Sequence, residues 1–188
     1  MQVLKDEIRN KILQAAEALF FETGFRDTTM RNIADVAGIS VSNLYLYYDN
    51  KHALYYGVTD SFHDYFIRGF QAFVDHDEES KEMIGDICDT WYKVIRADHK
   101  KFVITADKSQ GTKYAGFKGQ MIDILYRHMK SQVGRQYGCD ELILYILAKN
   151  FIEGIVEIAK EYHGDDSWLA NCLNSLVSYH MNGMAHLL

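Results

Sequence analysis

Histidine and cysteine are the side chains best suited to metal binding and nucleophilic chemistry, and this 188-residue chain has eight and three of them. None of the histidines stands in an HExxH or comparable metal-ligand spacing. Cys88, Cys139 and Cys172 are far apart and form no CxxC pair, which predicts neither a disulfide framework nor a zinc site. The GxSxG, P-loop and GxGxxG motifs are missing too. We therefore expect no catalytic residue, no metal and no cofactor.

Three carboxylates are spaced regularly enough to act together. Glu153, Glu157 and Glu161 lie four residues apart, which places them on one face of a predicted helix. Such a group could hold a cation, but nothing else in the sequence supports a metal site there. A solvated face, or the rim of an interface, is the expected role.

The helices that position the remaining side chains follow from the hydrophobic period and the lack of proline, which together predict an all-α chain. Thr29 and Ser40 are placed to cap two short helices, and Gly24 and Gly38 to end the preceding ones. The expected helices span residues 5–23, 30–36, 41–48, 51–74, 80–97, 99–107, 113–133, 140–161 and 167–187. No run reaches about 18 apolar residues and no signal peptide is visible, so we expect a cytoplasmic protein without a membrane span.

Residues 29–48 carry a spacing typical of a helix-turn-helix. Ala34 supplies the small residue needed where the two helices touch. Gly38, four positions later, can adopt the positive φ of the turn. Leu44, six positions further, supplies the buried aliphatic side chain of the second helix. An ordinary αα-hairpin is commoner in proteins generally, and these spacings alone leave both interpretations open.

A wider pattern over residues 8–54 consists of Ile12-Leu13, Ala15-Ala16, Leu19-Phe20, Gly24-Phe25, Thr28-Thr29, Ile33-Ala34, Ala37-Gly38-Ile39-Ser40, Leu44-Tyr45, Tyr47-Tyr48, Lys51 and Leu54. This pattern resembles the N-terminal domain of the TetR family of bacterial transcription regulators. Tyr48 stands where Phe is usual, and Asp49-Asn50 where a basic residue or Ser is common. Beyond residue 55 only the helical architecture is shared.

The resemblance implies a DNA-binding domain over residues 1–50 and a ligand-binding and dimerisation domain over 51–188. Residues 41–48 would enter the major groove of double-stranded DNA. The side chains expected at the operator are Thr29, Arg31, Ser40, Val41, Ser42, Asn43, Tyr45, Tyr47 and Lys51.

Within that set, Val41 and Asn43 would meet base edges, and Lys51 would neutralise a phosphate. For Tyr45 and Tyr47, packing inside the domain stays an alternative to contact with sugar or phosphate. Leu44 and Leu46 are expected in the core.

The charge of this segment limits how it could bind DNA. The whole chain carries −6, and residues 1–52 hold six basic and seven acidic residues, a net −1. Phosphate attraction is therefore weak, so specific binding must rest on a few placed contacts and on a dimer. We expect weak non-specific binding and a modest dependence on salt.

The helices expected at 140–161 and 167–187 are apolar nearly all round, which is typical of burial on several sides. One core could absorb both. The resemblance implies instead that they pair with their twins in a homodimer, whose operator would be near-palindromic.

The middle helices are unusually aromatic. Any single ring there is most simply explained as core, but as a group they imply, in this family, a pocket for a small apolar or aromatic effector. The candidate lining residues are Phe62, Phe66, Trp91, Phe102, Tyr114, Phe117, Met121 and His128. An effector would act by pushing on the helix at 51–74.

The expected function is thus a ligand-responsive transcriptional regulator, most simply a repressor, and not an enzyme. The alternative is an all-α small-molecule binding protein or enzyme with a merely structural N-terminal helix pair. A regulator must expose the surface of residues 41–47, whereas a structural hairpin would bury it.

Overall fold

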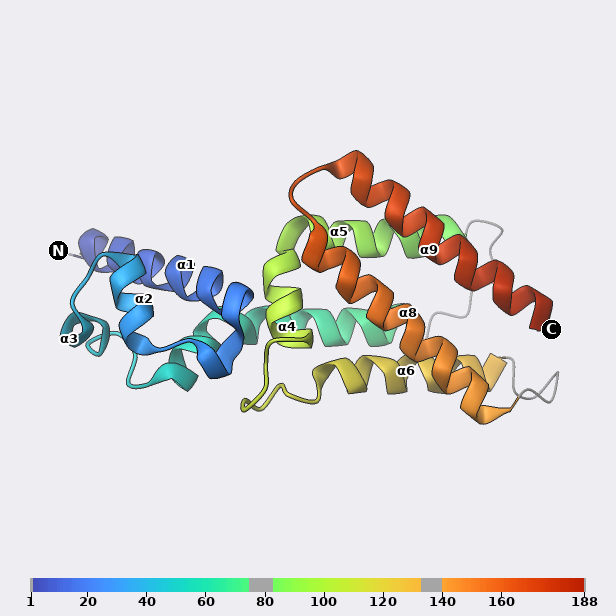
Figure 1. The fold of residues 1–188 in the computed structure, drawn as a ribbon, viewed down its shortest axis with the longest axis horizontal. Helices are drawn as coiled ribbons and strands as arrows, with labels where there is room; N and C mark the ends of the chain where they lie inside the picture. Colours follow the sequence, from blue (N-terminus) through green and yellow to red (C-terminus); the bar gives the residue numbers. More distant parts are fainter. Residues whose placement is uncertain (1, 75–82, 133–139, 188) are drawn as a thin grey trace.

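The computed structural model describes residues 2–74, 83–132 and 140–187, which are helical with turns and contain no strand (Figure 1). The helices are α1 (Gln2–Asp27), α2 (Met30–Ala37), α3 (Val41–Leu44), α4 (Lys51–Val74), α5 (Met83–Ala106), α6 (Phe117–Gln132), α8 (Glu141–Glu161) and α9 (Asp166–Leu187). The predicted all-α class is confirmed. Cys139 and the predicted helix start at residues 80–82 lie outside the described part of the chain.

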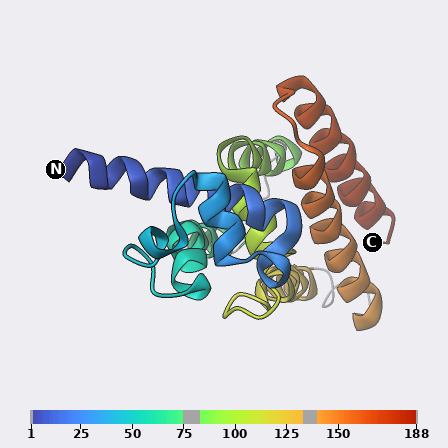
Figure 2. The same cartoon turned by 60° about the vertical axis from the view of Figure 1, so that its left-hand side comes forward.

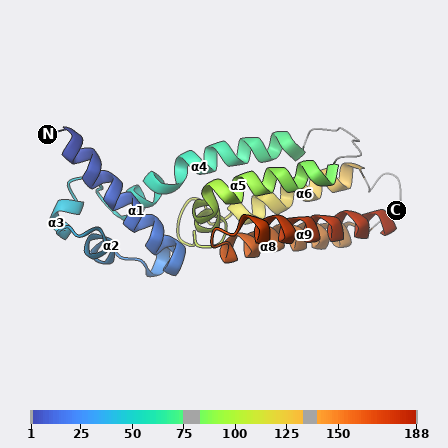
Figure 3. The same cartoon turned by 90° about the horizontal axis from the view of Figure 1, so that it is seen from above.

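The molecule is elongated, with α1–α3 grouped at one end and α5, α6, α8 and α9 bundled at the other (Figure 1). Seen from above, α4 runs from the α1–α3 group along the bundle, so it belongs to both (Figure 3). Helices α8 and α9 lie paired along one side of the bundle (Figure 2). Among the helices described, none is long and apolar enough to cross a membrane.

The helix boundaries near the N-terminus are set by the capping residues that the sequence predicted. Thr29 precedes α2, and its hydroxyl oxygen accepts a hydrogen bond from the Asn32 N–H at 3.1 Å. Gly38 ends α2 with φ +69°, a left-handed conformation that glycine adopts without strain. Gly24 also has a positive φ, +80°, but it only interrupts α1, which resumes for one turn up to Asp27, so the helix predicted at 5–23 is longer at both ends than expected.

The second short helix is briefer than predicted. The expected helix at 41–48 is α-helical only over Val41–Leu44, after Ser40 caps it by accepting from the Asn43 N–H at 3.1 Å. The Leu46 and Tyr47 N–H groups turn back over only three residues, to Asn43 O at 3.1 Å and Leu44 O at 3.0 Å, whereas the Tyr48 N–H returns over four residues, to Leu44 O. A hydrogen-bonded turn that is partly tighter than an α-helix therefore follows α3 up to Tyr48.

Two further boundaries differ from expectation. The helices predicted at 80–97 and 99–107 are one helix, α5, with a kink at Asp98, where φ is −142°. Helix α6 begins at Phe117 and not at residue 113, because the preceding residues form turns. There the Ser109 hydroxyl donates to the Tyr114 carbonyl at 3.0 Å, so side-chain bonds compete with helix formation.

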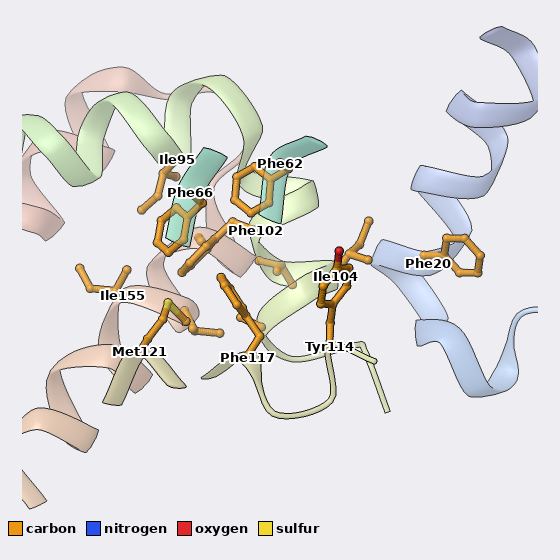
Figure 4. Close-up of a cluster of buried hydrophobic side chains, with 14 of the residues drawn as sticks. Phe20, Phe62, Phe66, Ile95, Phe102, Ile104, Tyr114, Phe117, Met121 and Ile155 are labelled. Atoms are coloured by element: carbon orange, nitrogen blue, oxygen red, sulfur yellow. The ribbon is translucent and has the colours of Figure 1, made fainter. Parts of the chain in front are cut away.

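One hydrophobic core runs through the described helices, from Phe20 of α1 to Ile155 of α8 (Figure 4). Both of these side chains are fully buried. The α1–α3 group is therefore packed on the rest of the molecule and is not a separate unit on a linker.

Candidate nucleic-acid interface

The inner face of the α2–α3 pair is sealed. Ala34 and Leu44, two residues of the predicted helix-turn-helix spacing, are both 0% exposed. Tyr48 is buried as well, and the Arg9 Nε–H donates to its hydroxyl at 3.4 Å. A Cβ at Gly57 of α4 would lie only 3.1 Å from the Tyr48 ring, so α4 fits closely around that ring. These contacts fix the direction in which the opposite face points.

The outer face of α3 and its turn is open to solvent. Ser42 and Tyr45 are exposed, while Val41, Asn43 and Tyr47 are partly exposed. Leu46, which we expected in the core, is 82% exposed. That expectation is wrong because Leu44 and Tyr48 take the inward positions of the turn, which leaves Leu46 on the outside.

The candidate residues before α3 are exposed, and two of them also make contacts within the protein. Arg31 and Thr29 lie on the solvent side at the start of α2, and the Thr29 hydroxyl also contacts the Asn32 side-chain oxygen. Ser40 is exposed, and its hydroxyl lies 3.0 Å from that of Ser42. Both cap hydroxyls thus have a local structural role besides any contact with a partner.

Lys51 differs from its predicted role as a phosphate ligand. Its ammonium donates to three main-chain carbonyls, those of Phe25 at 2.6 Å, Arg26 at 3.2 Å and Thr28 at 2.6 Å. It also lies 4.4 Å from the centre of the Phe25 ring. Since an ammonium has three N–H donors, all are used inside the protein. Burial lowers the pKa of Lys51, and the negative charge of Asp27 offsets part of this shift by raising it.

A turn segment, residues 108–116, joins the α1–α3 group to the bundle. The Phe25 N–H donates to the Lys108 carbonyl at 2.9 Å. The His52 Nε2 atom lies 3.2 Å from the Gly111 carbonyl oxygen, and the Lys113 N–H donates to the Tyr56 hydroxyl at 3.1 Å. No local sequence pattern indicates these contacts, because the bonded residues lie 57 or more positions apart.

Most of the candidate pocket residues meet in one aromatic cluster. Phe66 is central, with ring centroids 5.6 Å from Phe62, 5.9 Å from Trp91, 5.5 Å from Phe102 and 5.5 Å from Phe117. Figure 4 shows four of these rings gathered between α4, α5 and α6. These separations are ordinary packing distances for aromatic rings, so the cluster is closely packed here.

The other three candidate pocket residues occupy different places. Met121 is fully buried on α6, and His128, further along α6, is partly buried. Tyr114 lies at the edge of the cluster, where its hydroxyl donates to Asp60 Oδ1 at 2.6 Å and its ring stacks on His63 at 4.0 Å. Burial, together with the neighbouring Asp60 carboxylate, raises the pKa of Tyr114.

An apolar face is exposed along α8 and α9. On α8, Leu142 is 63% exposed, and Ile143, Tyr145 and Ile146 are about 40% exposed. On α9, Trp168 and Tyr179 are exposed as well. The buried residues of α8, such as Ile152 and Ile155, lie on its other side and pack against the rest of the bundle.

Two of the three evenly spaced carboxylates of α8, Glu153 and Glu157, are engaged in ion pairs. Glu153 lies 2.9 Å from the Lys118 ammonium, and Glu157 lies 2.7 Å from that of Lys160. Both lysines also reach Asp107, at 3.1 and 2.8 Å. Among the residues that the structure describes, no group of three His, Cys, Asp or Glu could hold a metal ion.

Residues 12–56 match the family described as bacterial regulatory proteins, tetR family. A transcriptional repressor named KstR2, from Rhodococcus jostii, is 32% identical over 100 residues, which is 53% of this chain and 49% of that protein. The regulator RutR of Escherichia coli K12 is 37% identical over 65 residues, 35% of this chain and 31% of its own length. The chain thus spans about half the length, or less, of these curated relatives.

Solved structures of similar fold cover nearly the whole chain. A TetR-like transcriptional regulator from Rhodococcus sp. RHA1 aligns over 94% of this chain and 96% of its own, with a TM-score of 0.64 and 19% identity. FadR from Bacillus subtilis, solved in complex with stearoyl-CoA, aligns over 92% and 97%, with a TM-score of 0.55 and 18% identity. At these identities the similarity establishes the fold alone.

Proposed function

We propose that this chain belongs to the TetR family of bacterial regulators, whose description its residues 12–56 match, and that it is a ligand-responsive repressor that binds double-stranded DNA through the outer face of α3. One observation carries the proposal. The helix pair buries Ala34 and Leu44 completely while it leaves Ser42 and Tyr45 exposed. A merely structural hairpin, as in the alternative of an enzyme or binding protein, would cover that outer face.

An α-helix fits the major groove, where each base pair presents a distinct edge. Asn43 could pair with adenine through two hydrogen bonds, and the methyl groups of Val41 could meet a thymine methyl. Tyr45, Tyr47 and Arg31 flank this surface and would contact sugar or phosphate. Lys51 supports the surface indirectly, because it ties the start of α4 to the end of α1.

The partner of this chain is proposed to be a second copy, paired through α8 and α9. Their exposed apolar side chains, among them Leu142 and Tyr179, would be covered by the same residues of the partner around a two-fold axis. The two α3 helices would then enter successive major grooves about 34–36 Å apart, on a near-palindromic operator.

The effector is proposed to be a small apolar or aromatic molecule that opens the cluster around Phe66. Phe62 and Phe66 lie on α4, the helix whose first residue is Lys51. A ligand that displaces these rings would move α4 and hence the α1–α3 group, so ligand and operator would weaken each other's binding. The proposed boundary at residue 50 separates the DNA-binding domain from the ligand-binding and dimerisation domain, and α4 is shared by the two.

Substitution of Asn43 tests the DNA-binding role. Its side chain is partly exposed and only its main-chain N–H serves the Ser40 cap, so Asn43→Ala should preserve the fold. We expect at least about a tenfold loss of affinity for a selected operator, measured by fluorescence anisotropy, with helicity and mass in solution unchanged. Gln120→Ala, an exposed amide on α6, is the matched control. Equal binding by Asn43→Ala and the control would refute the assignment.

A further inference from the structure

Leu46 is unusual among the large apolar side chains of the α1–α3 group. It is 82% exposed, against 48% for its neighbour Tyr45 and 0% for Leu44. Single exposed apolar side chains are common on protein surfaces, so exposure alone identifies no partner. The exposure of Leu46 is informative because of its position.

The position of Leu46 places it on the surface already proposed to face DNA. Ser42, Tyr45 and Leu46 are all exposed, whereas Leu44 and Tyr48 are buried, which puts the three exposed side chains on the outer side of α3 and its turn. The main chain is held there, because the Leu46 N–H bonds to Asn43 O at 3.1 Å and the Tyr48 N–H bonds to Leu44 O at 3.1 Å. The outward direction of Leu46 is therefore built into the turn.

The charge of the segment indicates what Leu46 can contribute. With a net −1 over residues 1–52, the surface gains little from phosphate attraction, so contacts with the bases must supply more of the binding free energy. The edges of the bases in the major groove carry one methyl group, the 5-methyl of thymine. It is the group in that groove best matched to a leucine side chain.

We propose that Leu46 is a specificity-determining residue that contacts the 5-methyl group of a thymine in each half of the operator. The inference rests on the proposed DNA-binding function and extends it to a residue outside the polar set. The contact would favour thymine at one position per half-site.

Replacement of thymine by deoxyuracil tests the contact directly, because uracil keeps every hydrogen-bonding group and lacks only the methyl. An operator is first selected from random duplexes with the wild-type protein, and each thymine is then replaced in turn. We expect about a fourfold loss of affinity at one position per half-site, the value for one buried methyl group. Leu46→Ala should bind the thymine and uracil duplexes equally at that position, and Leu46→Met should restore the difference.

Tyr65→Ala is the control, because Tyr65 is 76% exposed but lies on α4 well beyond its first turns. It should keep the wild-type response to uracil. If Leu46→Ala responds to every uracil substitution as the wild type does, or binds the operator as tightly, the contact is refuted while the DNA-binding function stands. If the wild-type protein selects no DNA at all, the proposed function fails with it.

Discussion

The Lys51 ammonium donates a hydrogen bond of 2.6 Å to the carbonyl oxygen of Thr28, 23 residues earlier in the chain. The same ammonium also donates hydrogen bonds to the carbonyl oxygens of Phe25 and Arg26. One side chain thus binds the carbonyl groups at the end of α1 and in the turn before α2. The first residue of α4 is thereby fastened to the segment that leads into the helix-turn-helix. This gives α4 a direct mechanical connection to the proposed DNA-binding surface.

Lys51→Met should therefore lower the free energy of unfolding by about 1–3 kcal/mol, because it leaves three carbonyls without this partner. Urea denaturation followed by circular dichroism measures the change, with the exposed Lys93→Met as control. The dependence of DNA affinity on salt should stay the same as in the wild type. An unchanged stability combined with a shallower salt dependence would show that Lys51 is a phosphate ligand after all.

A side chain at Gly38 should destabilise the protein because of the backbone conformation there, and not because of a steric clash. Its φ is +69°, and a Cβ there would meet no atom within 4 Å. Gly38→Ala should cost about 1 kcal/mol of stability, and Gly38→Asn less, because Asn enters the left-handed region more readily. Thermal melts compare these variants with Gly116→Ala, a glycine with similarly open surroundings and no positive φ. Equal melting temperatures for Gly38→Ala and the wild type would contradict the assigned turn.

His180 should make the stability fall in mild acid. Its ring packs on Phe151 at a centroid distance of 4.6 Å, and burial lowers its pKa below the ordinary 6.5. The unfolded chain therefore takes up a proton at a higher pH than the folded chain does. The stability contributed by neutral His180 is complete above about pH 6.5 and declines as the pH falls through the folded pKa.

His180→Leu should flatten this part of the stability profile, as measured by urea denaturation between about pH 5 and pH 7. His163→Leu serves as the control, since His163 is exposed on the connection before α9. If the profile of His180→Leu falls as steeply as that of the wild type, His180 is not held neutral by burial.

Charges on the exposed face of α8 should separate the proposed dimer. Leu142 and Ile146 are one helical turn apart and are 63% and 40% exposed, so glutamate at both should leave each protomer folded. We expect sedimentation equilibrium to show a 21.7 kDa species for the double variant and twice that mass for the wild type. Affinity for a palindromic operator should fall, while binding to a single half-site should not change. A monomeric wild type at micromolar concentration would exclude pairing through this face.

The sequence predicted the features of the fold that depend on neighbouring residues. The caps Thr29 and Ser40 and the positive φ of Gly38 all follow from local preferences, and all are present. Capping hydroxyls and glycine act within a few positions of the chain, so their patterns are readable without a tertiary structure.

The features that the sequence missed depend on distant residues. Leu46 has the composition of a core residue, and only the inward placement of Leu44 and Tyr48 turns it outward. Lys51 matched a phosphate-binding position, but its carbonyl partners come from 23 to 26 residues earlier. No local pattern encodes such a pairing.

Selection of duplexes from a random pool by the wild-type protein is the decisive measurement for the proposed DNA-binding function. We expect enrichment of one near-palindromic sequence whose half-site centres are about 34–36 Å apart, with binding that needs the outer face of α3. The salt dependence of this binding should correspond to the release of no more than about four to eight counterions per dimer. Failure to enrich any sequence, or enrichment that persists equally with Asn43→Ala, would contradict it.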